Sequence, residues 1–278
     1  MHTDTAILTG ARHTANATPC QDYSIAGMLP DGSAWAIISD GCSTGEQTDL
    51  GARAWAIAAR EVLKRTPDLH KEPTLFQQQV LGYAEPLLAI HELNDGTATL
   101  GVLRVVEKAI RAIVFGDCVL IGRHLDGGIT FINITYTLNA PFYLNYLRKP
   151  GWAQNWREAY AGQLRRVIIS RYDAEGNLLK LKTEEEPGDA PFVWDAHVDN
   201  DELEMVLLAT DGAPEAGECL KQTIQDIAAI KVPKGEFMKR RIAKLTRNWQ
   251  RMGKMPGDDM AIAAIWLHDI PEPQADKA

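Results

Sequence analysis

Residues 97–135 read TATLGVLRVVEKAIRAIVFGDCVLIGRHLDGGITFINIT and contain four strand-like runs. The runs are Thr97–Val106, Ala109–Phe115, Cys118–Leu125 and Gly128–Thr135. Only two residues separate each run from the next, a spacing that is typical of β-hairpins. We therefore predict an antiparallel meander of four strands, which argues against a doubly wound parallel sheet.

Other segments predict further strands and two pairs of helices. Three more strand-like runs are Ala34–Ser39, Leu203–Ala209 and Met260–Leu267. The apolar spacing i, i+3, i+4, i+7 and its variants predict the helix pairs Thr48–Arg65 with Phe76–Leu93, and Cys219–Ile230 with Gly235–Arg251. Pro86 predicts a kink in the second helix. Helices grouped before and after runs of strands favour an α+β protein with helix layers packed on sheets.

Composition and charge exclude several classes of protein. The chain has 278 residues, 45% hydrophobic and 24% charged, which excludes a disordered, collagen-like or coiled-coil protein. With 29 basic against 37 acidic residues the net charge is −8, and no basic run is present to bind nucleic acid. No apolar stretch reaches the ~18 to 20 residues of a membrane span, and the first residues do not resemble a secretion signal. We expect a monomeric cytoplasmic protein without nucleic-acid or membrane partners.

The domain organisation is expected to be simple. The four cysteines show no CxxC spacing, so reduced thiols are expected rather than a zinc site or disulfides. Residues 1–270 are predicted to form one domain, and residues 271–278 a disordered tail. Within the domain, seven of the twenty aromatic residues fall in Tyr136–Tyr160, and we interpret residues 136–165 as an aromatic-rich insertion. Its Arg148, Lys149 and Arg157 make it positively charged on an acidic protein.

Aspartates fall where predicted strands end or begin. Asp40 closes AWAIISDG, Asp211 closes MVLLATDG, Asp117 lies in the turn after AIVFGD, and Asp258 with Asp259 precedes MAIAAIWL. In an antiparallel sheet the end of one strand lies beside the start of its neighbour, so these carboxylates are expected to converge on one edge. The alternative for any single site is an ordinary Asp-Gly turn.

Converging carboxylates repel one another unless protons or cations neutralise them. Ligands that are all oxygens favour Mg²⁺ or Mn²⁺ over Zn²⁺, which prefers nitrogen and sulfur. The glycines after Asp40 and Asp211 would let the backbone approach a ligand closely, so that the carbonyl of Gly41 is a further candidate ligand.

Five ordered motifs resemble those of the metal-dependent protein phosphatases of the type 2C family, in their bacterial form. The motifs are HTANATPCQD (His13–Asp22), SDGCSTGEQTDLGARAWA (Ser39–Ala56), Gly96–Gly128, ATDGAPE (Ala209–Glu215) and GDDMAIAAIW (Gly257–Trp266). The resemblance implies a four-layer αββα sandwich of two antiparallel sheets flanked by helix pairs. It also implies hydrolysis of phosphoserine or phosphothreonine in a phosphorylated protein by a water that bridges two Mn²⁺ or Mg²⁺ ions.

The resemblance also assigns roles to individual residues. Asp40, Asp211 and Asp258 are the implied catalytic residues, and Arg12 with His13 the implied phosphate-binding pair. The implied metal ligands are Asp22, Asp40, the Gly41 carbonyl, Asp211 and Asp258, with Asp117 on a weaker third ion. Asp259 is expected to orient a water or its neighbour. The insertion occupies the place of a mobile flap in the family.

The sequence departs from the family after Asp40-Gly41. Relatives often have His or Met followed by two glycines, whereas this chain has Cys42, Ser43 and Thr44. No general acid is identified. Two alternatives stay open: a catalytically weak or inactive regulatory protein on the same fold, and a phosphatase of small phosphorylated metabolites. For Arg12, an ordinary surface arginine is the competing interpretation.

Overall fold

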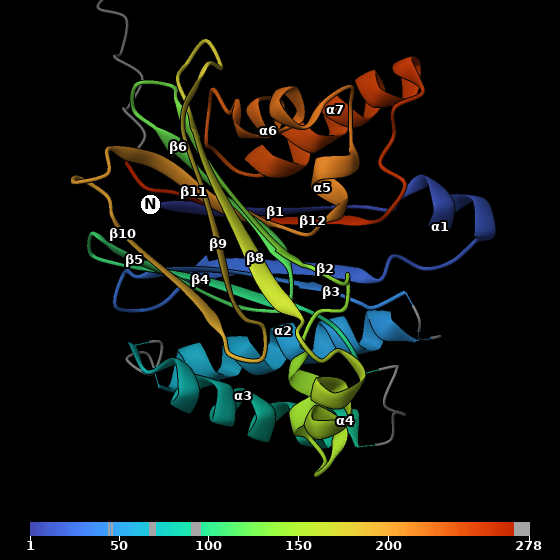
Figure 1. Cartoon of the computed structure of the whole chain (residues 1–278). Coiled ribbons are helices and arrows are strands. Elements are labelled where there is room, and N and C mark those ends of the chain that lie inside the picture. The colour runs from blue at the N-terminus through green and yellow to red at the C-terminus, as the bar shows by residue number, and fades with distance from the viewer. Residues whose placement is uncertain (44, 46, 67–70, 90–95, 270–278) are drawn as a thin grey trace, which may run out of the picture.

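The computed structural model describes residues 1–43, 45, 47–66, 71–89 and 96–269. In this part of the chain two antiparallel sheets face each other, with helices on both outer sides (Figure 1). The seven-stranded sheet has the order β1 (His2–Leu8), β12 (Met260–Trp266), β11 (Leu203–Ala209), β6 (Cys118–His124), β7 (Ile129–Tyr136), β8 (Leu164–Tyr172) and β9 (Leu178–Pro187). The five-stranded sheet has the order β10 (Phe192–His197), β5 (Ala109–Phe115), β4 (Leu100–Val106), β3 (Ala34–Asp40) and β2 (Asp22–Met28).

One helix pair covers each sheet. Helices α2 (Thr48–Arg65) and α3 (Pro73–Leu88) pack on the five-stranded sheet, and α6 (Leu220–Ala228) with α7 (Phe237–Met252) on the seven-stranded one (Figure 1). Four shorter helices are α1 (Ala11–Asn16), η2 (Leu144–Leu147), α4 (Trp152–Ala159) and α5 (Gly212–Glu215). The predicted α+β class and the αββα layer order are confirmed.

Three main apolar clusters hold the four layers together. The first joins α6 and α7 to the seven-stranded sheet, the second joins α2 and α3 to the five-stranded sheet, and the third lies between the sheets. Central strands such as β3 and β12 are buried on both faces, which explains their continuous apolar sequences. The ends of these strands are thereby fixed, and the loops that follow them are positioned by a rigid scaffold.

The predicted four-stranded meander is wrong in its middle connection. Strands β4 and β5 form one hairpin and β6 and β7 another, but the hairpins belong to different sheets. Gly116 and Asp117 therefore cross from one sheet to the other instead of turning within one. Gly116 has φ 92°, a left-handed conformation that suits glycine. This crossing places Asp117 at the end of the sandwich, between the two sheets.

The predicted helices agree with the structure more closely than the predicted set of strands. Thr48–Arg65 forms α2 with the predicted bounds, and the pair near residues 219–251 forms α6 and α7. Pro86 lies inside the last turn of α3, which ends at Leu88. Residues 90–93 of the predicted helix and the predicted tail lie outside the described residues. The sequence pattern did not predict strands β1, β2, β8, β9 and β10.

No helix in the described ranges is long and apolar enough to span a membrane.

Candidate metal centre

Carboxylates gather around a cavity of about 410 Å³ at one end of the sandwich. The lining residues are Arg12, Asp40, Gly41, Cys42, Ser43, Asp117, Asn139, Pro141, Tyr143, Asp211, Glu215 and Asp258. Four of the predicted aspartates are among them. The convergence predicted from the strand ends therefore holds for Asp40, Asp117, Asp211 and Asp258.

Each aspartate is positioned by the end of an element. Asp40 is the last residue of β3 and lies directly across from Asp22, the first residue of β2. Asp211 connects β11 to α5, and Asp258 precedes β12. Because β11 and β12 are antiparallel neighbours, the end of the first lies beside the start of the second.

Asp22 lies behind this cavity instead of on its wall. Its side chain is buried, with 5% of its surface exposed, and its Oδ2 accepts a hydrogen bond from Thr210 Oγ1 at 2.6 Å. Asp40 shares a hydrogen bond with Asp22 and another with Asp211. The Thr210 hydroxyl also accepts a hydrogen bond from the Ala261 N–H at 2.8 Å and so joins β11 to β12. No feature of the sequence pattern had marked Thr210 as part of the site.

Burial and mutual repulsion make this site costly to ionise. Burial raises the pKa of Asp22 to about 8, with a further contribution from the charges of Asp259 and Asp211. Burial and the Asp211 charge raise the pKa of Asp117 to about 7. The pKa of Asp40 lies well above its usual range because of burial and then the charges of Asp22 and Asp211. Burial also raises the pKa of Asp211, and the Asp258 charge adds to the effect.

Arg12 is the cation on the cavity wall. Its Nη2 lies 2.6 Å from Asp258 Oδ2 and 3.8 Å from Glu215 Oε2, while 62% of its side chain is exposed. Glu215 was not predicted as a site residue, although it belongs to the ATDGAPE motif, and its Oε2 also accepts the Asp258 N–H at 3.2 Å. Arg12 is therefore held beside the carboxylates with its donors open to solvent, as a phosphate ligand requires.

His13 does not line the cavity. Its Nδ1 lies 2.6 Å from Asp259 Oδ2, and only 13% of its side chain is exposed. Asp259 also accepts hydrogen bonds from two backbone N–H groups, those of Gly10 at 2.7 Å and Gln21 at 2.6 Å. Asp259 therefore joins β12 to the segments on both sides of α1, which is a positioning role for both residues.

The two Asp-Gly glycines serve the packing of the backbone. A Cβ added to Gly41 would lie 2.7 Å from the Thr48 carbonyl oxygen, and one added to Gly212 would lie 1.8 Å from the Asp259 carbonyl oxygen. Close contact between neighbouring backbone segments therefore requires glycine at both positions, and the expectation that these glycines let the backbone approach a ligand stays a prediction. Gly41 nevertheless lies on the cavity wall.

The thiols near the site differ in exposure. Cys118 is buried, with 1% exposed, and burial raises its pKa well above the usual range. Burial also raises the pKa of Cys20 to about 12. Both thiols are therefore protonated at neutral pH and weakly nucleophilic. Cys42 alone of the three lies on the cavity wall, where the Tyr143 hydroxyl contacts it.

The aromatic insertion between β7 and β8 is folded onto the sandwich. Tyr136, Phe142 and Trp156 form a small apolar cluster, in which the Phe142 and Trp156 rings meet edge to face at 5.0 Å between centroids. Asn139, Pro141 and Tyr143 line the carboxylate cavity. The segment contains η2 and α4, and η2 packs against α3. It therefore forms one wall of the cavity.

Arg148 of this insertion is buried, not available to a substrate. Only 2% of its side chain is exposed; its Nε lies 2.8 Å from Glu85 Oε2, and its Nη2 donates to the Leu88 carbonyl at 2.8 Å. Arg148 therefore anchors the insertion to α3. Of the three cations that make the insertion positively charged, only Lys149 and Arg157 are exposed.

Replacing Arg148 with Ala is expected to lower the free energy of unfolding by about 2 kcal/mol, because the carbonyl of the buried Leu88 and the carboxylate of Glu85 lose their donor and a buried side chain is removed from the contact with α3. Thermal unfolding measures the loss. Lys149→Ala, which removes an exposed cation above the Trp152 ring, is the matched control and should change stability by less than about 1 kcal/mol. Equal losses for the two variants would contradict the anchoring role.

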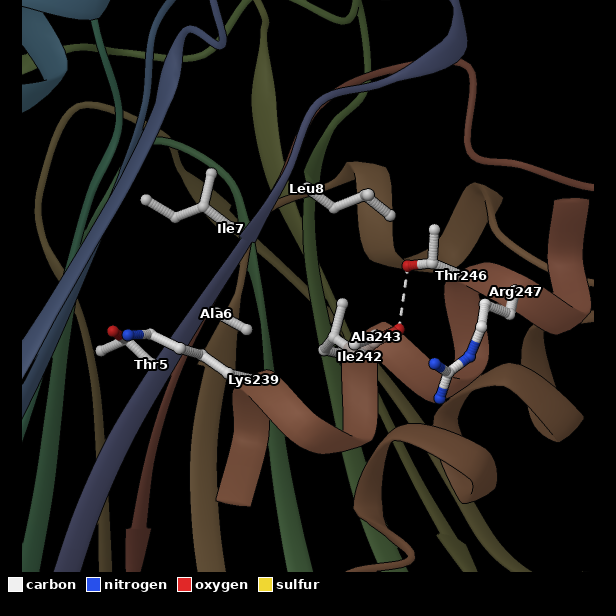
Figure 2. A pocket seen from close by; sticks show the side chains of 9 residues that line it. All are labelled: Thr5, Ala6, Ile7, Leu8, Lys239, Ile242, Ala243, Thr246 and Arg247. Carbon is white, nitrogen blue, oxygen red and sulfur yellow. Dashed lines mark hydrogen bonds between the residues drawn. The ribbon is translucent and has the colours of Figure 1, made fainter. Parts of the chain in front are cut away.

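A second cavity lies elsewhere in the described part of the molecule. It measures about 620 Å³ and lies between β1 and α7, where Figure 2 shows Ala6, Leu8 and Ile242 with Lys239 and Arg247. No carboxylate lines it. We place the chemistry in the smaller acidic cavity, because a catalytic site needs converging polar groups more than volume.

In the described part of the chain, no three His, Cys, Asp or Glu side chains already surround a common point as metal ligands. The carboxylates instead contact one another and Arg12. The donor set nevertheless fits a hard divalent ion, because it is made of oxygens whose repulsion a cation would relieve. The predicted metal roles of Asp22, Asp40, Gly41, Asp117, Asp211 and Asp258 stay predictions.

Fold and cavity together define an αββα sandwich protein with an acidic site at one end of its sheets. The family profile of protein phosphatase 2C matches residues 9–245, and the chain belongs to this family. No curated protein sequence matches it.

Several solved structures share the fold. A bacterial serine phosphatase has a TM-score of 0.60 at 11% identity, over 98% of this chain and 100% of that one. The serine/threonine phosphatase Stp1 from Staphylococcus aureus gives 0.56 at 12%, over 97% and 96%. A serine/threonine phosphatase from S. agalactiae gives 0.57 at 13%, over 96% and 99%. The likeness covers nearly the whole of each chain.

Proposed function

We propose that this protein is a Mg²⁺- or Mn²⁺-dependent phosphatase that hydrolyses phosphoserine and phosphothreonine in proteins. The observation that carries the proposal is the acidic cavity, in which Asp40, Asp117, Asp211 and Asp258 lie beside the exposed guanidinium of Arg12. Carboxylates suit hard cations, and a guanidinium suits the phosphate oxygens of the substrate. Membership of the protein phosphatase 2C family supports the same reaction.

We assign two ions to Asp40, Asp211, Asp258 and the Gly41 carbonyl, with Asp22 behind Asp40 supporting the second ion. When bound, such ions neutralise the phosphate charge and supply an activated water for direct attack on phosphorus. The raised pKa values of the aspartates support this assignment, because a site that resists ionisation by itself gains most from cations.

The remaining residues of the cavity bind and orient the substrate. Arg12 can donate to the phosphate oxygens while Asp258 and Glu215 hold its guanidinium in place. Tyr143 and Pro141 belong to the insertion and form its part of the cavity wall, where the peptide of a phosphoprotein would lie. Cys42 stands where relatives often carry His or Met, and we assign no general acid to it.

The test is hydrolysis of p-nitrophenyl phosphate and of a phosphothreonine peptide, each with Mn²⁺, Mg²⁺ or EDTA. We expect turnover of both with either ion and none with the chelator, because oxygen ligands bind these ions reversibly. Activity that resists EDTA, or that only Zn²⁺ supports, would contradict the proposed site.

The same assay decides between the alternatives. The changed loop after Gly41 is the observation that favours an inactive regulatory protein, and this reading requires no turnover of either substrate with any ion. A phosphatase of small metabolites would hydrolyse p-nitrophenyl phosphate but not the peptide.

Asp117→Ala tests whether a third ion contributes. Asp117 enters the cavity from the crossing between the sheets, separate from the pair of strands that carries Asp211 and Asp258. We expect the variant to keep two bound ions in calorimetric titration and to lose activity by about tenfold or more. Loss of all metal binding would assign Asp117 to the main pair of ions instead.

A further inference from the structure

Strand β9 is an open edge of the seven-stranded sheet. Within the described residues it pairs with β8 alone, and nine of its ten residues are exposed (Figure 1). Leu178, Leu179 and Leu181 are 52%, 62% and 59% exposed. An uncovered edge of this length presents free backbone donors and acceptors for another strand.

The charges along this edge form a self-complementary pattern. The segment reads LLKLKTEEEP, with Lys180 and Lys182 before Thr183, and Glu184 and Glu186 after it. Alternate residues of a strand share a face, so these four charges point to the same side of the sheet. If two such strands run antiparallel with Thr183 at the centre, every lysine faces a glutamate.

We propose that two copies of this chain form a symmetric dimer by antiparallel pairing of their β9 strands. A two-fold axis through the Thr183 pair places Lys182 opposite Glu184 of the second copy, and Lys180 opposite Glu186 of the second copy. Symmetry repeats each pair, giving four attractive pairs. The pairing joins the two sheets into one and covers the exposed side chain of Leu181.

Contacts within each copy already hold Glu184 and Glu186 in place before the dimer forms. Glu186 Oε1 lies 2.9 Å from Nη2 of Arg165, whose side chain is only 1% exposed. Lys182 contacts Glu184 on its own strand, and in the dimer it lies between two glutamates. The net charge of −8 on each copy opposes association, so the local lysine-glutamate pairs must offset a general repulsion.

The dimer leaves both acidic cavities open. The Glu186 end of β9 lies near the cavity, because Gly188 accepts a hydrogen bond from Tyr136, at the start of the insertion that lines it. Antiparallel pairing puts the two cavities at opposite ends of the shared ladder. Changes to Lys182 or Glu184 should therefore leave hydrolysis of a small substrate unaffected.

Charge reversal gives a sharp test. Lys182→Glu places glutamate against glutamate at two positions of the dimer, and Glu184→Lys places lysine against lysine. By sedimentation velocity over a range of concentrations, we expect wild type to dimerise and each variant to associate about tenfold more weakly or worse. An equimolar mixture of the two variants should dimerise again, because every facing pair is then attractive.

Two controls complete the design. The double variant Lys182→Glu with Glu184→Lys restores complementarity and should dimerise by itself. Lys244→Glu, on the exposed side of α7, changes net charge equally and should leave the dimer intact. A wild type that stays monomeric up to about 0.1 mM, or a dimer that is indifferent to Lys182→Glu and Glu184→Lys, overturns the proposal.

Discussion

Asp40→Asn is expected to lower metal-dependent phosphate ester hydrolysis by at least about a thousandfold, equivalent to about 4 kcal/mol of transition-state stabilisation. Asp40 lies at the centre of the acidic site, where it contacts both Asp22 and Asp211. Asparagine keeps the shape of the side chain but removes one negative charge. Steady-state kinetics with Mn²⁺, together with calorimetric metal titration, measures both consequences.

The same variant should be more stable than wild type when no metal is present. Burial raises the pKa of Asp40 and Asp22, so the folded protein holds protons that the unfolded chain releases above about pH 4. Stability from these groups is therefore present at low pH and is lost as pH rises toward 8. The metal-free wild type should melt at progressively lower temperature over this range, and Asp40→Asn less so.

Asp199→Asn is the matched control for this pair of expectations. Asp199 forms an exposed ion pair with Lys108 outside the cavity, so its loss should change neither turnover nor the pH dependence of melting appreciably. Near wild-type turnover by Asp40→Asn would exclude Asp40 as a metal ligand. A metal-free wild type whose melting temperature is constant from pH 5 to pH 8 would contradict the electrostatic account.

Gly212→Ala is expected to be the most destabilising small substitution at the site. The added Cβ would lie 1.8 Å from the Asp259 carbonyl oxygen, and a backbone atom cannot rotate away as a side chain can. Either α5 or the start of β12 must move, at a cost of about 3 kcal/mol. Thermal unfolding should show a decrease of about 5 to 10 °C.

Gly82→Ala supplies the comparison. Gly82 lies inside α3 with nothing within 4 Å of the added Cβ, so alanine should raise stability by about 0.5 to 1 kcal/mol through its helix propensity. If Gly212→Ala lowers the free energy of unfolding and Gly82→Ala raises it, then the contacts of the backbone around each glycine determine the change in stability. If Gly212→Ala has the same melting temperature as wild type, the contact between α5 and the residues before β12 can accommodate the added Cβ.

The parts of the fold that were predictable are those with a local pattern. Strands β5 and β11 were predicted with their observed bounds, because apolar runs ended by turn residues specify buried strands. Strand β9 was missed because it is exposed on both faces and its second half, TEEEP, carries no apolar residue. Hairpin spacing at Gly116 and Asp117 could not reveal a crossing between sheets, which depends on contacts distant in sequence.

Some residues of the candidate site could also be predicted from local sequence patterns, and others could not. The convergence of Asp40, Asp211 and Asp258 was predictable, since each stands at the end of a strand. Glu215 was missed because it belongs to a four-residue helix, where no periodicity marks it. Arg148 contributes to the positive charge of the insertion, and because charged side chains are usually exposed, only its tertiary contacts with α3 reveal that it is buried.

The position of β12 between β1 and β11 has a consequence for the order of folding. β12 is the last of the described strands to be synthesised, yet both of its neighbours are formed from chain made earlier. A nascent chain that lacks β12 leaves β1 unpaired with the rest of the seven-stranded sheet and exposes the edge of the apolar strand β11. Asp258 and Asp259 also arrive only with this strand. A nascent chain from which β12 has not yet emerged should therefore be inactive, because the sheet and the acidic site are both incomplete.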